Sequence, residues 1–164
     1  MKVESDISFL IINFNTSRLV NALIKSIREF AIGLQYNIVI FDNSDSEKMN
    51  LNEETNDIIV VDNTTGQFIN FNNLVVKMIK TDVGKSNNYA SFKHAFTIDY
   101  CLNNLDCLNR NVILCDSDIL LTKQIDFIDD AFIAVGEVKK TWSISNERLL
   151  PMLCYLNNRN AKRK

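Results

Sequence analysis

The sequence predicts an α/β fold in which a mostly parallel sheet is flanked by helices. Apolar blocks without polar alternation, such as Ile7–Asn15, recur along the chain, as is typical of strands buried on both faces. Between these blocks lie stretches with apolar residues at three- and four-residue steps, which is the pattern of helices packed on a sheet. A chain of 164 residues has room for one domain, and we expect a single domain over residues 1–164.

The first half of the chain predicts a strand, a helix and then further strands. The block Ile7–Asn15 predicts the first strand. Apolar side chains at helical spacing follow over residues 19–30, and Gly33 favours a helix end just beyond them. Further apolar runs typical of strands cover residues 38–41, 58–61 and 74–79. The first two of these runs end directly on aspartates, Asp42 and Asp62.

The second half predicts a helix over residues 86–103 and a strand over residues 112–115, which ends in Asp116-Ser117-Asp118. Apolar residues from Ile125 to Val135 then recur at helical spacing and predict a short helix. Residues 142–164 carry no clear periodic pattern and are interrupted by Pro151. We expect residues 157–164 to form a polar, basic tail.

Composition excludes several classes of protein. The net charge of −2 and the pI near 5.4 give no electrostatic reason to expect nucleic acid as a partner. Four glycines and one proline leave no glycine-rich dinucleotide fingerprint and no phosphate-binding loop. The single histidine, His94, excludes zinc motifs that need two histidines.

Cysteine usage and the N-terminal residues bear on the compartment. None of the four cysteines forms a CxxC pair, so we expect reduced thiols in a cytoplasmic protein. The apolar run near the N-terminus spans about nine residues, which is too short to cross a membrane. Acidic residues precede it and no small-residue cleavage site follows, so it is also unlike a signal peptide. We therefore predict a buried strand there and no membrane span.

Acidic residues follow the predicted strands. Asp42, Asp116 and Asp118 all lie at strand ends, and ligands of open parallel sheets bind beyond those ends. Carboxylates gathered at one edge repel one another unless a cation or a sugar hydroxyl engages them, and Asp-x-Asp suits both tasks. Aspartate is also a common turn residue, so turn formation is the alternative interpretation. The same alternative holds for Asp62, beside which Gln67 and Asn70 could line a cleft.

Three segments together resemble the N-terminal, nucleotide-binding part of family 2-like glycosyltransferases, which have the GT-A fold. They cover residues 7–27, 37–46 and 111–121, in the order of that family. The resemblance implies a Rossmann-like, mostly parallel GT-A sheet. It also implies that this chain holds the donor side of the domain and is truncated on the acceptor side.

The resemblance assigns expected roles to individual residues. The backbone of Phe14 and Asn15 corresponds to the positions near the nucleotide base, and Asp42 to the aspartate that hydrogen-bonds this base. Asp116 corresponds to the residue that faces the ribose or sugar, and Asp118 to the ligand of the divalent cation, so that the expected metal site is Asp118 with Asp116. Phe92-Lys93-His94 replaces an Ala-Arg-Asn stretch of the family, which makes Lys93 and His94 expected nucleotide-sugar-binding residues. Lys93 as a surface lysine and His94 as a half-buried side chain are the alternatives.

The implied reaction is glycosyl transfer, with inversion, from a UDP- or GDP-sugar to a saccharide or lipid-linked acceptor, assisted by Mn²⁺ or Mg²⁺. The family's catalytic base lies well downstream of the Asp-x-Asp strand, so we expect it beyond Lys164. Two other functions remain open. The chain could be a non-catalytic nucleotide-sugar-binding module. A GT-A-like nucleotidyltransferase is disfavoured, because Asn13–Thr16 lacks the glycine-rich basic loop of those enzymes.

Overall fold

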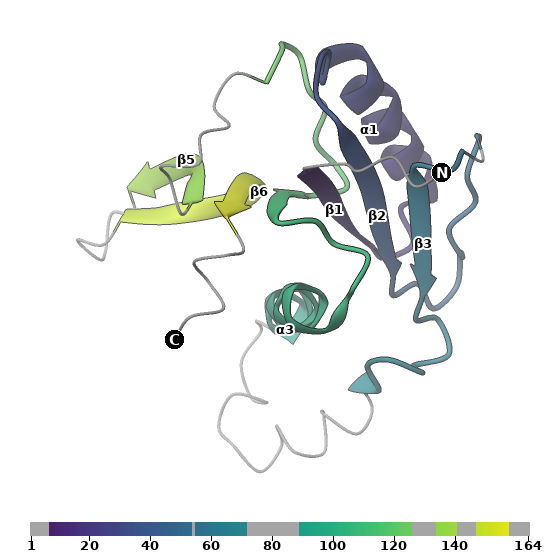
Figure 1. Cartoon of the computed structure of the whole chain (residues 1–164). Coiled ribbons are helices and arrows are strands. Elements are labelled where there is room, and N and C mark those ends of the chain that lie inside the picture. The colour runs from purple at the N-terminus through teal and green to yellow at the C-terminus, as the bar shows by residue number, and fades with distance from the viewer. Residues whose placement is uncertain (1–6, 54, 72–88, 126–133, 141–146, 158–164) are drawn as a thin grey trace.

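The fold is described from a computed structural model, which places residues 7–53, 55–71, 89–125, 134–140 and 147–157. Six strands in this part of the chain form one sheet in the order β3-β2-β1-β4-β6-β5 (Figure 1). The four parallel strands are β1 (Ile7–Asn13), β2 (Tyr36–Asp42), β3 (Ile58–Asp62) and β4 (Asn111–Cys115). Two antiparallel strands, β6 (Glu147–Asn157) and β5 (Ala134–Lys140), extend the sheet beyond β4. The predicted α/β fold with a mostly parallel sheet is confirmed.

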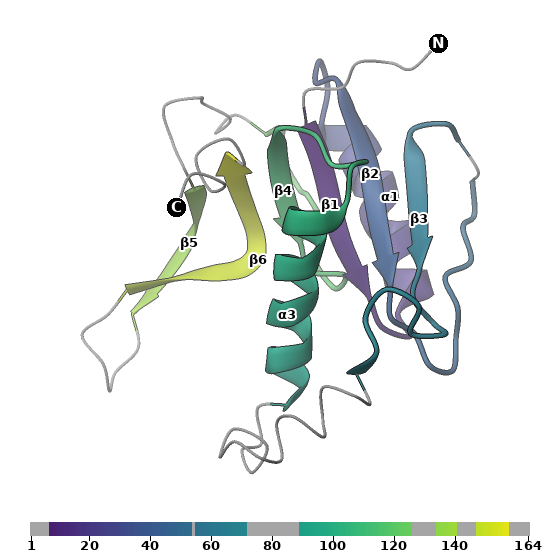
Figure 2. The same ribbon diagram turned by 60° about the horizontal axis from the view of Figure 1, so that its bottom comes forward.

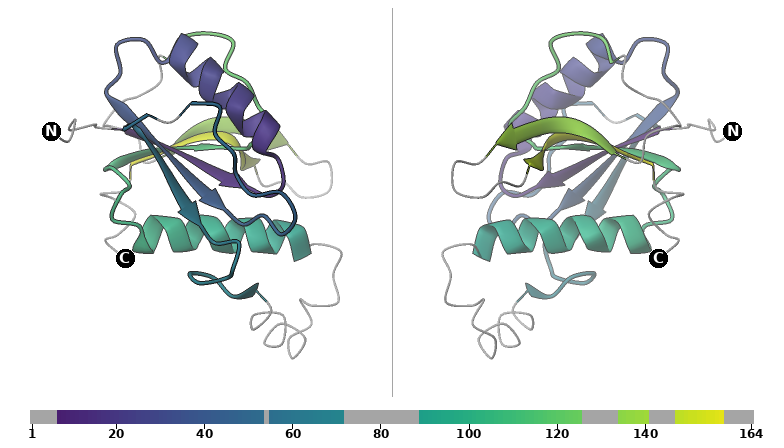
Figure 3. Two further views of the ribbon diagram at one scale, coloured as in Figure 1. Left: turned by 90° about the vertical axis from the view of Figure 1, so that its right-hand side faces the viewer. Right: turned by 90° about the vertical axis from the view of Figure 1, so that its left-hand side faces the viewer.

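Helices α1 (Ser17–Phe30) and α3 (Tyr89–Asn104) cover opposite faces of the sheet (Figure 3). Alternate residues of a strand point to opposite faces, so a strand covered on both faces is mostly apolar on both. Phe9 and Ile11 of β1 accordingly belong to the core under α1, whereas Leu10 and Ile12 belong to the core under α3. All seven residues of β1 and all five of β4 are buried, which explains the apolar runs at residues 9–12 and 112–115; the buried polar residues Ser8, Asn13 and Asn111 lie near the strand ends.

The second half of the sheet differs from the sequence prediction. Val135, expected on a short helix, lies in strand β5, so that prediction is wrong at this residue. Strand β6 occupies residues that show no clear periodic pattern, and it contains Pro151. Proline cannot donate to a ladder, and the register between β5 and β6 shifts beside it: Leu149 pairs with Val138, whereas Cys154, beyond Pro151, pairs with Gly136. Figure 2 shows the resulting bend in β6.

Several boundaries and predictions need separate mention. Helix α1 ends at Phe30, and Gly33, with φ of +80°, lies three residues beyond it. Asn157, expected to begin a tail, is the last residue of β6 and pairs with Asn111. Some features of the sequence lie outside the described residues. They are the apolar run at 74–79, the start of the helix predicted from residue 86, Phe132, Trp142 and residues 158–164. Neither of the two described helices combines the length and apolarity that crossing a membrane requires.

Candidate functional site

The carboxyl ends of the four parallel strands lie at one edge of the sheet. In the strand register, Asn13 of β1 is level with Asp42 of β2, which is level with Asp62 of β3. The chain leaves β1 through α1 toward β2 but returns through α3 to β4 on the other side of β1. The order of the strands therefore reverses between β1 and β4, and a crevice at such a point is where open α/β sheets bind ligands. Figure 2 shows β1, β2 and β3 pointing toward this edge.

A hollow of about 240 Å³ opens at this edge, beside the ends of β1, β2 and β3. Asn43 and Asn63 fix its walls, because the Asn63 side chain donates to Asn43, which in turn donates to Thr97 of α3 (2.8 and 2.9 Å). Asn70, weighed from the sequence as a cleft residue, lines this hollow. The lining residues are Phe14, Asn43, Ser44, Asp45, Asn63, Thr64, Thr65, Gly66, Ile69, Asn70, Phe71 and Lys93.

Helix α3 brings two adjacent predicted residues to two parts of the edge. Lys93 lines the hollow, and its ammonium group lies 5.1 Å from the centroid of the Phe71 ring, in a cation–π contact. The next residue, His94, places Nε2 3.4 Å from Oδ1 of Asp116. One helix therefore joins the hollow to the Asp-Ser-Asp turn after β4.

Asp42, predicted to hydrogen-bond a base, faces the protein interior and is only 2% exposed. Its Oδ1 accepts hydrogen bonds from the Asn13 side chain (2.9 Å) and from both the amide and the hydroxyl of Ser44. Its Oδ2 accepts from the backbone amide of Met49 (2.7 Å). Four donors occupy the two oxygens, and this geometry favours the turn-forming interpretation of Asp42 over direct contact with a base.

Phe14 and Asn15 have different surroundings. Phe14 is 49% exposed and lines the hollow. Asn15 has a left-handed backbone with φ of 55°, a conformation that asparagine tolerates better than most residues. Its Oδ1 accepts hydrogen bonds from three consecutive amides, those of residues 45–47, at 3.0–3.2 Å. The Asn15 side chain therefore holds the loop after β2 against the end of β1.

Three polar residues that the sequence analysis did not select complete the edge. Asn13 is fully buried, and its Oδ1 accepts from the amide and the hydroxyl of Thr16 (3.1 and 2.8 Å). The Thr16 hydroxyl lies 3.0 Å from the hydroxyl of Ser117, in the turn after β4. Asn13 directly follows the apolar residues of β1, so it was expected to be buried. A buried amide needs hydrogen-bond partners, and this requirement is the sequence signal for a polar network at the strand end.

The Asp116-Ser117-Asp118 turn is the candidate cation site. Asp116 is partly exposed and Asp118 is exposed. In the part of the chain that the structure describes, no three His, Cys, Asp or Glu side chains gather into a metal-binding group. Mg²⁺ is commonly held by one or two carboxylates together with substrate phosphates. The turn therefore fits a cation whose remaining ligands come from a bound phosphate group or water.

Asp62 closes the turn after β3. Its Oδ1 accepts from the amide and the hydroxyl of Thr64 (2.8 and 2.6 Å), and the Lys48 ammonium lies 3.1 Å from its Oδ2. These hydrogen bonds, with the Thr64 hydroxyl contributing most, lower the pKa of Asp62 to about 2. The Asp62 carboxylate therefore stabilises the loop after β3, which forms one wall of the hollow.

Three cysteines lie among the described side chains, and all are free thiols. Burial raises the pKa of Cys101 to about 12, and it also raises the pKa values of Cys107 and Cys115. Raised pKa values disfavour the thiolate, which is the nucleophilic form. These three thiols therefore act as small apolar groups in the fold.

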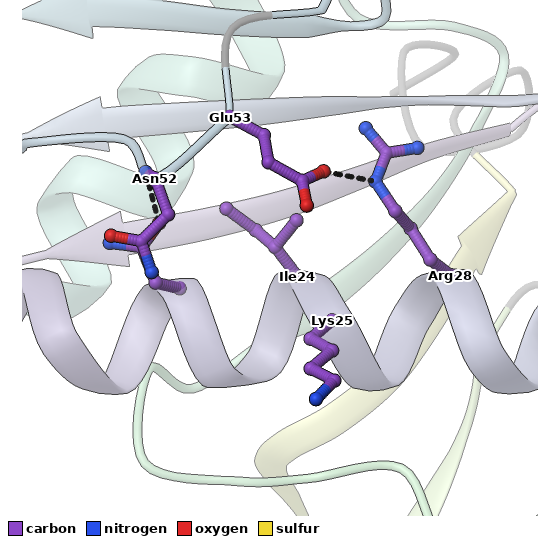
Figure 4. A pocket seen from close by; sticks show the side chains of 6 residues that line it. Ile24, Lys25, Arg28, Asn52 and Glu53 are labelled. Atoms are coloured by element: carbon purple, nitrogen blue, oxygen red, sulfur yellow. Dashed lines mark hydrogen bonds and ion pairs between the residues drawn. The ribbon is translucent and has the colours of Figure 1, made fainter.

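A second hollow, of about 230 Å³, lies between α1 and the loop around residue 52 (Figure 4). Arg28 binds the Asp57 carboxylate through both terminal nitrogens (3.0 and 3.3 Å), and its Nε lies 3.8 Å from Glu53. In Figure 4 the Lys25 side chain points away from Glu53. The charged side chains around this hollow mostly pair with one another. These pairs hold the loop against α1, and they leave few charged groups available to bind a ligand.

No protein-family model matches this chain, and no match to it was found among the curated proteins. Its function must therefore be argued from the fold and from the residues at the carboxyl edge.

Proposed function

We propose that this chain forms the donor-binding part of a glycosyltransferase that uses a nucleotide-diphosphate sugar with Mn²⁺ or Mg²⁺. The observation that carries the proposal is the arrangement at the end of β1. A ring-sized hollow lies on its β2 side, and the Asp-Ser-Asp turn lies on its β4 side. A nucleotide-sugar is an extended ligand, with an aromatic base at one end and a diphosphate farther along, and it matches this order of features.

The hollow suits a nucleobase in shape and chemistry. Phe14 and Phe71 supply aromatic surface, and the amide and hydroxyl groups of its lining offer hydrogen-bonding partners at the rim. Its volume of about 240 Å³ accommodates one ring system and not a whole nucleotide-sugar. The remainder of the ligand would extend along the sheet edge toward β4.

The turn after β4 suits the diphosphate end. Asp116 and Asp118 would hold the cation, with phosphate oxygens as its further ligands. When bound, the cation neutralises negative charge on the departing diphosphate, which favours cleavage of the glycosidic bond. Lys93 adds positive charge at the rim of the hollow, and Nε2 of His94 lies 3.4 Å from Oδ1 of Asp116 in the turn. We assign no general base to the described residues.

Titration calorimetry with UDP and GDP, each with and without Mn²⁺, tests the proposal. We expect Mn²⁺ to strengthen binding of one of the two nucleotides, and Asp118→Ala to abolish this dependence. Asp106→Ala is the matched control, because Asp106 is an exposed aspartate in the turn before β4, at the opposite edge of the sheet. Absence of nucleotide binding in the wild type, or unchanged Mn²⁺ dependence in Asp118→Ala, contradicts the proposal.

Binding alone does not distinguish transfer from storage of a nucleotide-sugar. Release of UDP or GDP from the corresponding sugar nucleotide, followed over hours with Mn²⁺ present, supplies the second readout. Slow hydrolysis that disappears in Asp118→Ala supports an enzyme. Tight, metal-dependent binding with no release at all supports the binding module instead.

A further inference from the structure

Strand β3 lies at one edge of the sheet, and within the described residues only its β2 side is paired. In the left view of Figure 3 it is the strand nearest to the viewer. The Asn63 amide donates to the carbonyl of Asp42 in β2 (2.8 Å), so the odd-numbered residues at this strand direct their backbone groups toward β2. The amides and carbonyls of Ile58, Val60 and Asp62 therefore point away from the sheet.

The chain itself satisfies two of these six outward groups. The Ile58 amide donates to the carbonyl of Thr55 (3.1 Å), and the Asp62 carbonyl accepts from the Gln67 side chain (2.7 Å). Four groups are left open: the Ile58 carbonyl, the amide and the carbonyl of Val60, and the Asp62 amide. No hydrogen bond joins these four open groups to another part of the chain that the structure describes. Unpaired backbone groups in a row are a template for a further strand.

The side chains of β3 do not oppose such pairing. Edge strands are usually protected from association by charged residues, proline or irregular pairing. Residues 58–61 are Ile-Ile-Val-Val, and Val60 is 38% exposed. The opposite edge strand, β5, contains Glu137, Lys139 and Lys140, and its register with β6 is irregular. Of the two edges, β3 is therefore the one suited to a partner strand.

The four open groups match a second copy of the same strand. If two copies pair antiparallel about a two-fold axis at Val60, each Val60 amide reaches the Val60 carbonyl of the other copy. Each Asp62 amide then reaches the Ile58 carbonyl of the other copy. These hydrogen bonds use every open group, and the groups left over are the two that the chain already satisfies. Asp62 lies opposite Ile58 in this register, so no two carboxylates of β3 face each other.

We propose that two copies of this chain form a two-fold symmetric dimer in which their β3 strands pair antiparallel and join the two sheets. The five residues of β3 form a smaller contact than a standard protein interface, so we expect a weak dimer that depends on concentration. Antiparallel pairing places the carboxyl edges of the two copies at opposite ends of the contact. The dimer is independent of the proposed function.

A pair of charged variants tests the proposal by sedimentation velocity. In Val60→Lys and in Val60→Glu, like charges face each other at the two-fold axis, which is unfavourable for directly opposite residues. Each variant alone should therefore remain monomeric at concentrations where the wild type dimerises. An equal mixture of the two should regain a dimer, because lysine then faces glutamate. Val60→Thr keeps a neutral, β-branched side chain and should dimerise like the wild type.

Amide hydrogen exchange of the wild type, followed by NMR, locates the contact. The amides of Val60 and Asp62 should exchange several-fold more slowly in a concentrated sample than in a dilute one. The amides of Ile59 and Val61 already donate to β2, so their exchange should be the same in both samples. This alternation along one strand distinguishes strand pairing from a contact between side chains alone. The measurement also decides the matter if the charged variants do not fold.

The outcomes are as follows. A wild type that stays monomeric as its concentration rises overturns the proposal. A dimer that Val60→Lys leaves unchanged also overturns it, because the contact then lies elsewhere. Loss of the dimer in both charged variants without recovery in their mixture contradicts the antiparallel register. Nucleotide binding by monomeric Val60→Lys, measured by calorimetry with Mn²⁺, tests the proposed function separately, so that either proposal can fail alone.

Discussion

Replacing Asp42 by asparagine tests how the loop after β2 is held. Asp42 is 2% exposed and accepts four hydrogen bonds, two of them from the backbone amides of Ser44 and Met49. Asparagine has nearly the same size but only one acceptor oxygen. Whichever way its amide turns, an N–H group must face at least one buried N–H donor of the protein.

The size of the effect follows from these contacts. A buried donor left without a partner costs about 1–3 kcal/mol, and hydrogen bonds to a charged acceptor contribute about 1.5–3 kcal/mol each. The smallest conflict, at Met49 alone, combines a lost charge-assisted bond with an unpaired amide. The two figures overlap, because losing the bond is what leaves the amide unpaired, so we expect Asp42→Asn to lower the free energy of unfolding by about 2–4 kcal/mol.

Urea denaturation followed by circular dichroism measures this change. Asp45→Asn is the control, because its carboxylate is exposed and surface substitutions usually change stability by about 0.5 kcal/mol or less. An Asp42→Asn protein as stable as the control variant would refute the view that the carboxylate anchors the loop.

Three further predictions concern the core, the stability at low pH and the thiols. Leu23→Ala, at a fully buried position of α1, should cost about 2–5 kcal/mol in urea denaturation, and a cost below about 1 kcal/mol contradicts the assigned packing. The pKa of Asp62 is about 2 in the fold and 3.8 ordinarily, so its contribution is full above about pH 4 and is lost as the pH falls toward 2. Asp62→Asn should therefore make the free energy of unfolding fall less steeply between about pH 4 and about pH 2 than in the wild type. An equal fall in the two proteins contradicts the stabilising role of the Asp62 carboxylate. Cys101 and Cys115 should resist iodoacetamide at pH 8 in the native protein and react after unfolding, as read by mass spectrometry of their peptides. Rapid native labelling of Cys115 contradicts its burial.

The central sheet was predictable because each of its strands satisfies a simple physical rule. Strands covered by helices on both faces carry apolar side chains at most positions, as β1 does over residues 9–12 and β4 does over residues 112–115. The edge beyond β4 was not predictable in this way. Val135 fits a helical spacing, yet it pairs with Tyr155 in an antiparallel ladder. Pro151 argues against a long strand in the sequence, although β6 extends on both sides of it. Pairing with a distant strand overrides local pattern in both places.

The candidate site was predictable in position and less so in detail. Strand ends place Phe14, Asp116 and Asp118 at one edge, as the sequence implies, and Lys93 and His94 lie over it. Asp42 is at the predicted edge but points inward, because the turn after β2 brings the amides of Ser44 and Met49 to its carboxylate. The direction of a side chain at a strand end depends on the loop that follows it, and residue spacing alone does not contain that information.

The most direct test of the proposed donor site is amide NMR mapping of a UDP and a GDP titration with Mg²⁺ present. We expect signals to move in three groups along the carboxyl edge: residues 14–16, residues 63–71 and residues 116–118. The hollow beside α1 serves as an internal comparison, and its residues Asn21, Lys25 and Asn52 should stay unchanged. Shifts centred on that second hollow, or none at saturating nucleotide, would contradict the assignment of the donor site to the carboxyl edge.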